Sequence, residues 1–158
     1  MRRLSKRTQY SLRALYGLTR SYKEGPKLIV ELAAEESIPK KFLEQILLAL
    51  KDKGLVDSKK GRGGGYFLAR PPEEITLGYV IRMIEGPLAP LPCASETAFR
   101  KCDECADVAT CGTRIVMRDV RNAMAKILDR TTLQMICQKM DEAAAKKSSG
   151  EAELMFHI

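Results

Sequence analysis

Hydrophobic residues recur at helical spacing through most of the chain, with one interruption. Apolar positions three and four residues apart predict a first helix from a cap at Ser5 to about residue 22, a short second helix over 28–36 and a third over about 39–53. In the second helix, Leu28, Leu32 and Ala33 are expected to face inward. Gly54 stands where a glycine commonly ends a helix, so the third helix should stop there.

After Gly54 the hydrophobic period changes. Segments 55–59 and 66–70 are strand-like, and they flank the sequence Lys-Gly-Arg-Gly-Gly-Gly over 60–65. Two short strands joined by a basic, glycine-rich loop predict a β-hairpin. Thr76 can cap a fourth helix that runs to about residue 85. A proline-containing irregular stretch over 86–103 then precedes a long helix over about 112–129 and a last helix to about residue 146.

This order of elements predicts a mainly α fold with a small β-hairpin wing, that is, a winged helix-turn-helix plus a long C-terminal dimerisation helix. Val116, Val120, Ala123 and Ile127 repeat at four-three-four spacing on the long helix. Such a stripe packs in a core or pairs with a symmetry mate, and in a small domain the pairing is favoured. We divide the chain into a DNA-binding domain (1–86), a cysteine-rich sensor loop (87–111), dimerisation helices (112–147) and a flexible tail (148–158).

Composition adds a chemical asymmetry. The 158 residues are 45% hydrophobic and 30% charged, which is typical of a globular protein. The net charge of +7 is uneven, because residues 1–70 hold 16 Lys and Arg against 7 Asp and Glu, and residues 71–158 hold 11 against 13. A basic half indicates a polyanion partner. Without an apolar window of about 18 residues or a signal-peptide pattern, we expect a cytoplasmic protein with reduced thiols and no membrane partner.

Candidate DNA contacts fall on three segments. The third helix would present residues at its exposed N-terminal side, where recognition helices read base edges: Lys40, Lys41, Glu44 and Gln45. The hairpin would place basic residues along phosphates or in the minor groove: Lys59, Lys60 and Arg62. The start of the first helix offers further backbone contacts: Arg2, Arg3, Lys6 and Arg7. All of these side chains would also be unremarkable as solvated surface residues.

Four of the five cysteines lie close together, in the pattern Cys-x8-Cys-x2-Cys-x5-Cys: Cys93, Cys102, Cys105 and Cys111. Thiolates prefer iron–sulfur clusters, zinc or copper(I), and four of them complete the ligation of a cluster. Structural zinc usually takes two paired knuckles, of which only one is present here. A thiol–disulfide switch needs no metal. Spacing alone leaves the three options about equal, and Cys137 is expected to be a small buried hydrophobe.

An enzyme is not expected. The single histidine is His157 near the C-terminus, no paired carboxylates stand out, and the Cys102-x2-Cys105 pair lacks the βαβ context of a thiol oxidoreductase. A protein-binding adaptor that retains a winged helix is the remaining alternative to a regulator, and salt-dependent DNA binding separates the two.

A string of motifs in fixed order resembles one family over about residues 4–136. Its parts are Phe-Leu-Glu-Gln-Ile over 42–46, Lys-Gly-Leu-Val over 53–56, Gly-Gly-Gly-Tyr over 63–66 and Ala-Arg-Pro-Pro-Glu-Glu-Ile-Thr over 69–76. The string is similar to that of the Rrf2 (Rrf-two) family of winged helix-turn-helix transcriptional regulators, of IscR, NsrR and CymR type. The resemblance implies a homodimer that reads palindromic double-stranded DNA with its third helix and wing. Family wings often carry a basic residue before Gly-Pro-Gly-Gly-Gly, whereas here Lys60 precedes Gly61 and Arg62 replaces the proline.

The resemblance also bears on the cysteines. Three of them resemble the iron–sulfur ligands of the IscR and NsrR branches: Cys93, Cys105 and Cys111. The fourth ligands of those branches are missing, because Arg114 stands where the IscR branch has histidine and Gln9 where the NsrR branch has aspartate. Cys102 is extra and offers a fourth thiolate. We therefore expect a repressor controlled by an all-cysteine [2Fe–2S] or [4Fe–4S] cluster, with zinc or a metal-free thiol switch as alternatives.

Overall fold

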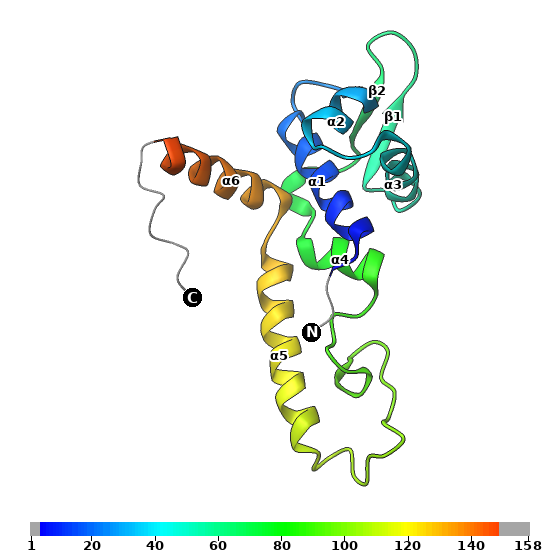
Figure 1. Cartoon of the computed structure of the whole chain (residues 1–158), viewed down its shortest axis with the longest axis vertical. Helices are drawn as coiled ribbons and strands as arrows, with labels where there is room; N and C mark the ends of the chain where they lie inside the picture. The colour runs from blue at the N-terminus through cyan, green and yellow to red at the C-terminus, as the bar shows by residue number, and fades with distance from the viewer. Residues whose placement is uncertain (1–3, 149–158) are drawn as a thin grey trace.

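The computed structural model describes residues 4–148 and has an elongated shape. A head built from the first helices and the hairpin lies at one end, and a long helix runs away from it with an irregular segment at its side (Figure 1). The last helix begins where the long helix meets the head and extends sideways from there (Figure 1). The predicted fold class, a mainly α protein with a two-stranded wing, is confirmed.

Three helices form the helix-turn-helix: α1 (Lys6–Arg20), α2 (Ile29–Glu35) and α3 (Lys40–Asp52). Ser5 caps α1 as predicted, since its side chain accepts a hydrogen bond from the Thr8 backbone N–H. The inward faces of the three helices share one core, whose largest fully buried side chains include Leu15, Leu32 and Leu47. Gly54 follows α3 with φ at +68°, a conformation that glycine adopts without strain.

One side chain of α2 lies where the sequence did not place it. Leu28 precedes the helix as its N-cap and is 48% exposed, so the prediction that it faces inward is wrong. The backbone at this point is extended rather than helical, because its neighbour Lys27 pairs with the hairpin. Leu32 is fully buried and Ala33 packs against the core, as predicted.

The wing consists of β1 (Val56–Lys59) and β2 (Gly65–Leu68), which pair antiparallel with Val56 opposite Leu68 and Lys59 opposite Gly65. A third backbone segment completes it. The N–H of Lys27 donates to the Tyr66 carbonyl, and the N–H of Tyr66 donates to the Lys27 carbonyl, both at 2.8 Å. The hairpin is therefore attached to the start of α2 as well as to the end of α3.

The second half contains a short 3-10 turn η1 (Pro72–Glu74), α4 (Leu77–Glu85) with the predicted Thr76 cap, and a second 3-10 turn η2 (Pro92–Ala94). The long helix α5 (Gly112–Arg130) and the last helix α6 (Leu133–Ser148) follow. The junction of α5 and α6 meets the start of α4, because the Leu77 N–H donates to Thr131 and the Leu133 N–H donates to Ile75, both at 2.9 Å. Leu133 is fully buried within the core of the head.

An ion pair fixes the direction of α5 relative to α4. Arg82 donates two hydrogen bonds to Asp129, from Nη1 to Oδ1 at 2.5 Å and from Nη2 to Oδ2 at 2.9 Å. Gly78 lies under this pair, where a Cβ would approach Asp129 Oδ1 to 1.9 Å. The ion pair in this position therefore leaves no room for a side chain at Gly78. Within residues 4–148, no helix is both long and apolar enough to cross a lipid bilayer.

Candidate nucleic-acid interface and cysteine loop

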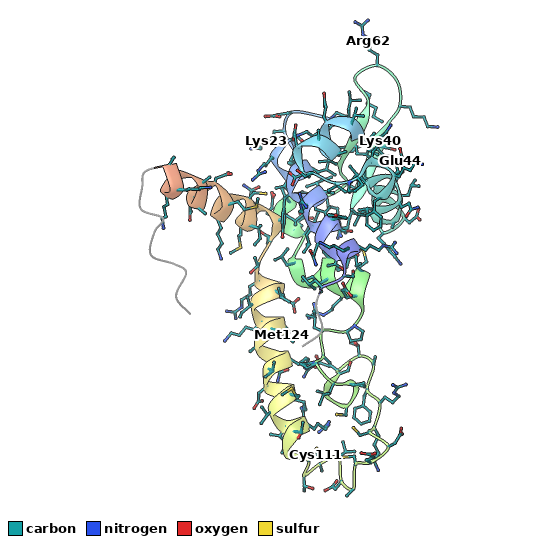
Figure 2. All side chains as sticks on the ribbon, viewed as in Figure 1. Lys23, Lys40, Glu44, Arg62, Cys111 and Met124 are labelled. Carbon is teal, nitrogen blue, oxygen red and sulfur yellow. The ribbon has the colours of Figure 1, made fainter. Side chains whose placement is uncertain are left out.

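The outer face of α3 carries the four side chains predicted to contact DNA. They are all exposed, whereas Leu43, Ile46 and Leu50 on the opposite face are buried. Lys40 Nζ lies 4.0 Å from Glu44 Oε1, one helical turn away, and both side chains are about half exposed. An exposed pair of this kind contributes little to stability, so both groups remain free to exchange partners with a ligand. Figure 2 labels Lys40 and Glu44 at α3, on the side of the head opposite Lys23.

The wing tip presents the other predicted cations. Lys59, Lys60 and Arg62 are exposed, and Arg62 stands at the outermost point of the hairpin in Figure 2. The turn depends on glycine, because Gly61 and Gly63 have φ of +89° and +71°. A Cβ on Gly64 would approach the carbonyl oxygen of Lys59 to 2.3 Å. The glycines thus fold the tip tightly and leave Arg62 as the only long side chain between Lys60 and β2.

Sequence reasoning missed how firmly the wing is attached to α3. Lys51, in the last turn of α3, places its ammonium 2.9 Å from Asp57 Oδ1 and donates to Ser58 Oγ at 2.6 Å. The hydrogen bond from Lys51 lowers the pKa of the Asp57 carboxyl below its usual range, and the backbone N–H of Ser58 acts in the same direction. These exposed contacts add to the backbone hydrogen bond from the Leu55 N–H to the Leu50 carbonyl at 3.0 Å, which joins the wing to the end of α3.

The start of α1 lies against α3 through aromatic rings. Tyr10 and Phe42 make an edge-to-face contact with centroids 5.5 Å apart. The Lys6 ammonium lies 5.9 Å from the Tyr10 ring centroid and the Arg13 guanidinium 5.7 Å from it. Lys6 and Arg7 are exposed, as their predicted role requires. Arg2 and Arg3 lie outside the described residues.

The cysteine loop, residues 87–111, runs beside α5 from the end of α4 (Figure 1). Its four thiols differ in exposure: Cys93 is buried, Cys105 and Cys111 are partly buried, and Cys102 is exposed. Cys102 is influenced electrostatically by Cys93 and Cys111, and Cys105 by Cys111 and Cys102, so the four thiols are neighbours. The pKa of Cys102 is raised, chiefly by the neighbouring Cys93, and that of Cys105 is raised chiefly by desolvation.

The four thiols are neighbours, but they do not form one tetrahedral set. Among residues 4–148, no three His, Cys, Asp or Glu side chains converge closely enough to hold a metal ion. The donor set itself, four thiols on an irregular loop, fits an iron–sulfur centre or zinc in number and in chemistry. Metal capture would require the thiols to come closer together. Cys137 lies apart on α6, where its buried thiol donates to the Tyr16 carbonyl at 3.7 Å.

Two arginines of α5 hold the cysteine loop through contacts that no sequence pattern indicated. Arg114 donates from Nε to the Cys93 carbonyl at 2.8 Å and from Nη1 to the Val108 carbonyl at 3.4 Å. Arg121 is 9% exposed and pairs through Nη1 with Glu96 at 2.6 Å. Arg114 is therefore engaged with the loop backbone at the position where the IscR branch was expected to have a histidine ligand.

The apolar stripe of α5 is exposed in the single chain. Val116 is 55% exposed and Ile127 65%, with Val120 and Ala123 between them also exposed. The face that meets the head and the loop is a different one, and it carries Arg114, Arg121 and Leu128. Among residues 4–148, the long helix therefore has a partner for the face with Arg114 and Arg121 and none for its apolar stripe.

A family model described as Rrf2, iron-dependent transcriptional regulator, matches residues 4–139. A putative HTH-type transcriptional regulator, rrf2-like, of Rhodobacter capsulatus is 37% identical over 134 residues, covering 83% of this chain and 89% of the relative. The solved structure of CymR, the global cysteine regulator of B. subtilis, superimposes with a TM-score of 0.74 at 30% identity, covering 88% of this chain and 98% of CymR. The structure of T. potens IscR gives a TM-score of 0.70 at 30% identity, covering 90% of each chain.

Proposed function

The chain belongs to the Rrf2 family of transcriptional regulators, and from this we propose that it is a homodimeric repressor whose affinity for a palindromic operator is controlled by an iron–sulfur cluster on the cysteine loop. A regulator of this kind works in the cytoplasm, where bacterial DNA lies. The DNA-binding part of this proposal rests on one observation: α3 has an exposed polar face, and a basic wing is joined to the same helix.

The chemistry of these surfaces suits double-stranded DNA. Gln45 can donate to and accept from adenine in the major groove, and Glu44 can accept from cytosine N4. Arg62, at the outermost point of the wing, suits a narrow minor groove, where the potential is most negative. The backbone hydrogen bond from Leu55 to Leu50 joins the wing to the end of α3, and the Lys51 contacts to Asp57 and Ser58 add to it, so helix and wing can engage DNA together.

Dimerisation is supported by the exposed stripe of α5. Val116, Val120 and Ile127 lie on one face at heptad-like spacing, and no segment among residues 4–148 covers them. A second copy of the same helix offers the matching surface in a two-fold arrangement. Pairing along α5 would set the separation of the two recognition helices, which must match half-sites about 34 Å apart.

The cysteine loop supports the sensor part of the proposal. Four thiols within 19 residues provide a complete ligand set without a histidine or carboxylate, and an iron–sulfur cluster bound by them would supply sensitivity to iron, oxidants or nitric oxide. Structural zinc on the same thiols, or a metal-free thiol switch between neighbouring cysteines, is the alternative.

The DNA-binding part is tested by selection from a randomised double-stranded library with the full-length protein. We expect a palindromic consensus, and we expect Gln45→Ala to relax preference at one position in each half-site while leaving the others unchanged. Lys23→Ala serves as a control, because Lys23 is exposed at the end of α1, away from α3 and the wing tip (Figure 2). A library without enrichment, or a consensus that Gln45→Ala leaves unaltered, contradicts the proposal.

Two further measurements address the dimer and the cluster. Ile127→Glu should convert a dimer to a monomer in light-scattering measurements, whereas Lys126→Glu, its exposed neighbour on the polar side, should not. Protein purified anaerobically should carry iron and sulfide, and Cys102→Ser should lower both while Cys137→Ser does not. A colourless wild-type protein with stoichiometric zinc rules out the iron–sulfur cluster and leaves the DNA-binding part standing.

A further inference from the structure

The cysteine loop is anchored near both of its ends by one side chain that is not itself a thiol. Arg114 donates to the carbonyl of Cys93 near the start of the loop and to that of Val108 near its end, at 2.8 and 3.4 Å. Its guanidinium also lies 5.7 Å from the ring centroid of Phe99 in the middle of the loop. A guanidinium has five N–H donors in a planar fork, so it can hold two carbonyls at once.

The four thiols are therefore presented to solvent unequally. Cys93 lies within η2, is 6% exposed and has its carbonyl held by Arg114. The neighbouring turn is fixed as well, because Ser95 Oγ accepts from the Ala98 N–H at 3.0 Å and Glu96 pairs with Arg121. Cys102 lies in the stretch between the two Arg114 contacts and is exposed.

We propose that Arg114 is a positioning residue of the sensor loop: it keeps the Cys93 thiol buried, so that a reagent from solvent meets Cys102 first and reaches Cys93 only when the Arg114 contacts open. This inference rests on the proposed function only in that the loop is taken to be the sensor. It assigns an order of reaction to the thiols and a role to Arg114 at the position where the IscR branch was expected to supply a ligand.

The test measures alkylation of each cysteine by iodoacetamide in the reduced, chelator-treated full chain, followed peptide by peptide by mass spectrometry. The alkylation rate of each thiol is compared between the wild type and the variants. In the wild type, Cys102 should react first. In Arg114→Gln, the Cys93 rate should rise about tenfold or more through local opening. Removing a positive charge near a thiol lowers its thiolate fraction, which by itself slows alkylation. A higher alkylation rate of Cys93 in the variant therefore shows that this thiol has become more exposed to solvent.

Two controls separate a local role from a general loss of structure. Cys137 is buried on α6 away from the loop, so its rate should not change in Arg114→Gln unless the whole fold opens. Arg118→Gln removes an exposed arginine one turn further along α5 and should leave Cys93 as slow as in the wild type. Arg114→Lys keeps the positive charge but lacks the planar guanidinium, so it should give an intermediate alkylation rate for Cys93.

Three results would overturn the inference: Cys93 as reactive as Cys102 in the wild type, an unchanged Cys93 rate in Arg114→Gln, or an equal acceleration of Cys93 and Cys137. Because the assay uses metal-free protein, its outcome is independent of whether the loop binds iron. Iron and sulfide analysis of the wild type tests the cluster separately. A failure of the proposed role of Arg114 is therefore distinguishable from the absence of a cluster.

Discussion

Gly65, at the start of β2, is the position where a single methyl group should detach the wing from the head. A Cβ there would lie 2.4 Å from the carbonyl oxygen of Lys27, which is backbone and cannot swing away, and φ is +145°. Gly65→Ala should therefore break the two 2.8 Å hydrogen bonds between Lys27 and Tyr66. Each lost hydrogen bond should cost about 1 kcal/mol and the backbone strain about 2 kcal/mol, whereas the stiffer unfolded chain should return about 0.7 kcal/mol. We therefore expect the free energy of unfolding to fall by about 3 kcal/mol.

Gly61→Ala is the matched control. Gly61 also has positive φ, at +89°, but nothing lies within 4 Å of its added Cβ. Strain alone should cost about 1 kcal/mol there. At equal protein concentration, the melting temperature should fall by about 6–12 °C for Gly65→Ala and by about 2–4 °C for Gly61→Ala. Hydrogen exchange should show the Lys27 and Tyr66 amides losing protection only in Gly65→Ala. Equal melting shifts with both amides still protected would refute the reasoning.

Three other changes have defined outcomes. Thr76→Ala removes the side chain that accepts from the Tyr79 N–H at 3.2 Å, so urea unfolding should show a loss of about 1 kcal/mol. Arg62→Ala should weaken operator binding and lower the slope of log affinity against log salt by about one, as measured by fluorescence anisotropy, and an unchanged slope would place Arg62 away from phosphate. Burial, with a smaller effect of Cys137, raises the pKa of Tyr16 from 10.0 to about 12. The folded state therefore keeps a proton that the unfolded state loses, and stability should be full below pH 10 and fall by up to about 2 kcal/mol towards pH 12. Tyr16→Phe should abolish that fall.

Local signals predicted the elements well. Ser5 and Thr76 cap α1 and α4, and Gly54 ends α3, because caps and C-terminal glycines act within a single turn of chain. The hairpin followed from the change of period and the glycine-rich loop. Leu28 was placed wrongly because helical periodicity at a helix start does not show that the preceding residue, Lys27, is paired with a strand more than thirty positions away.

The candidate site was less predictable from sequence. The exposure of the α3 and wing side chains followed from amphipathic spacing, but the side-chain contacts that join one element to another did not. Lys51 to Asp57, Arg82 to Asp129 and Arg114 to Cys93 join charged or polar groups that carry no periodic pattern. Such pairs depend on how elements pack in three dimensions, so a single sequence gives only their candidates. The requirement for glycine at position 78 is of the same kind, since only the approach of Asp129 creates it.

The burial of Leu133 has a consequence for how the protein is made. The core of the head includes this residue from α6, whose backbone also donates to Ile75. A ribosome adding about 5–20 residues per second therefore completes the recognition helix and wing several seconds before the residue that closes their core has been synthesised. Until then the nascent chain exposes part of an apolar interior. The core of the head therefore receives Leu133 only after the cysteine loop and α5 have also been synthesised.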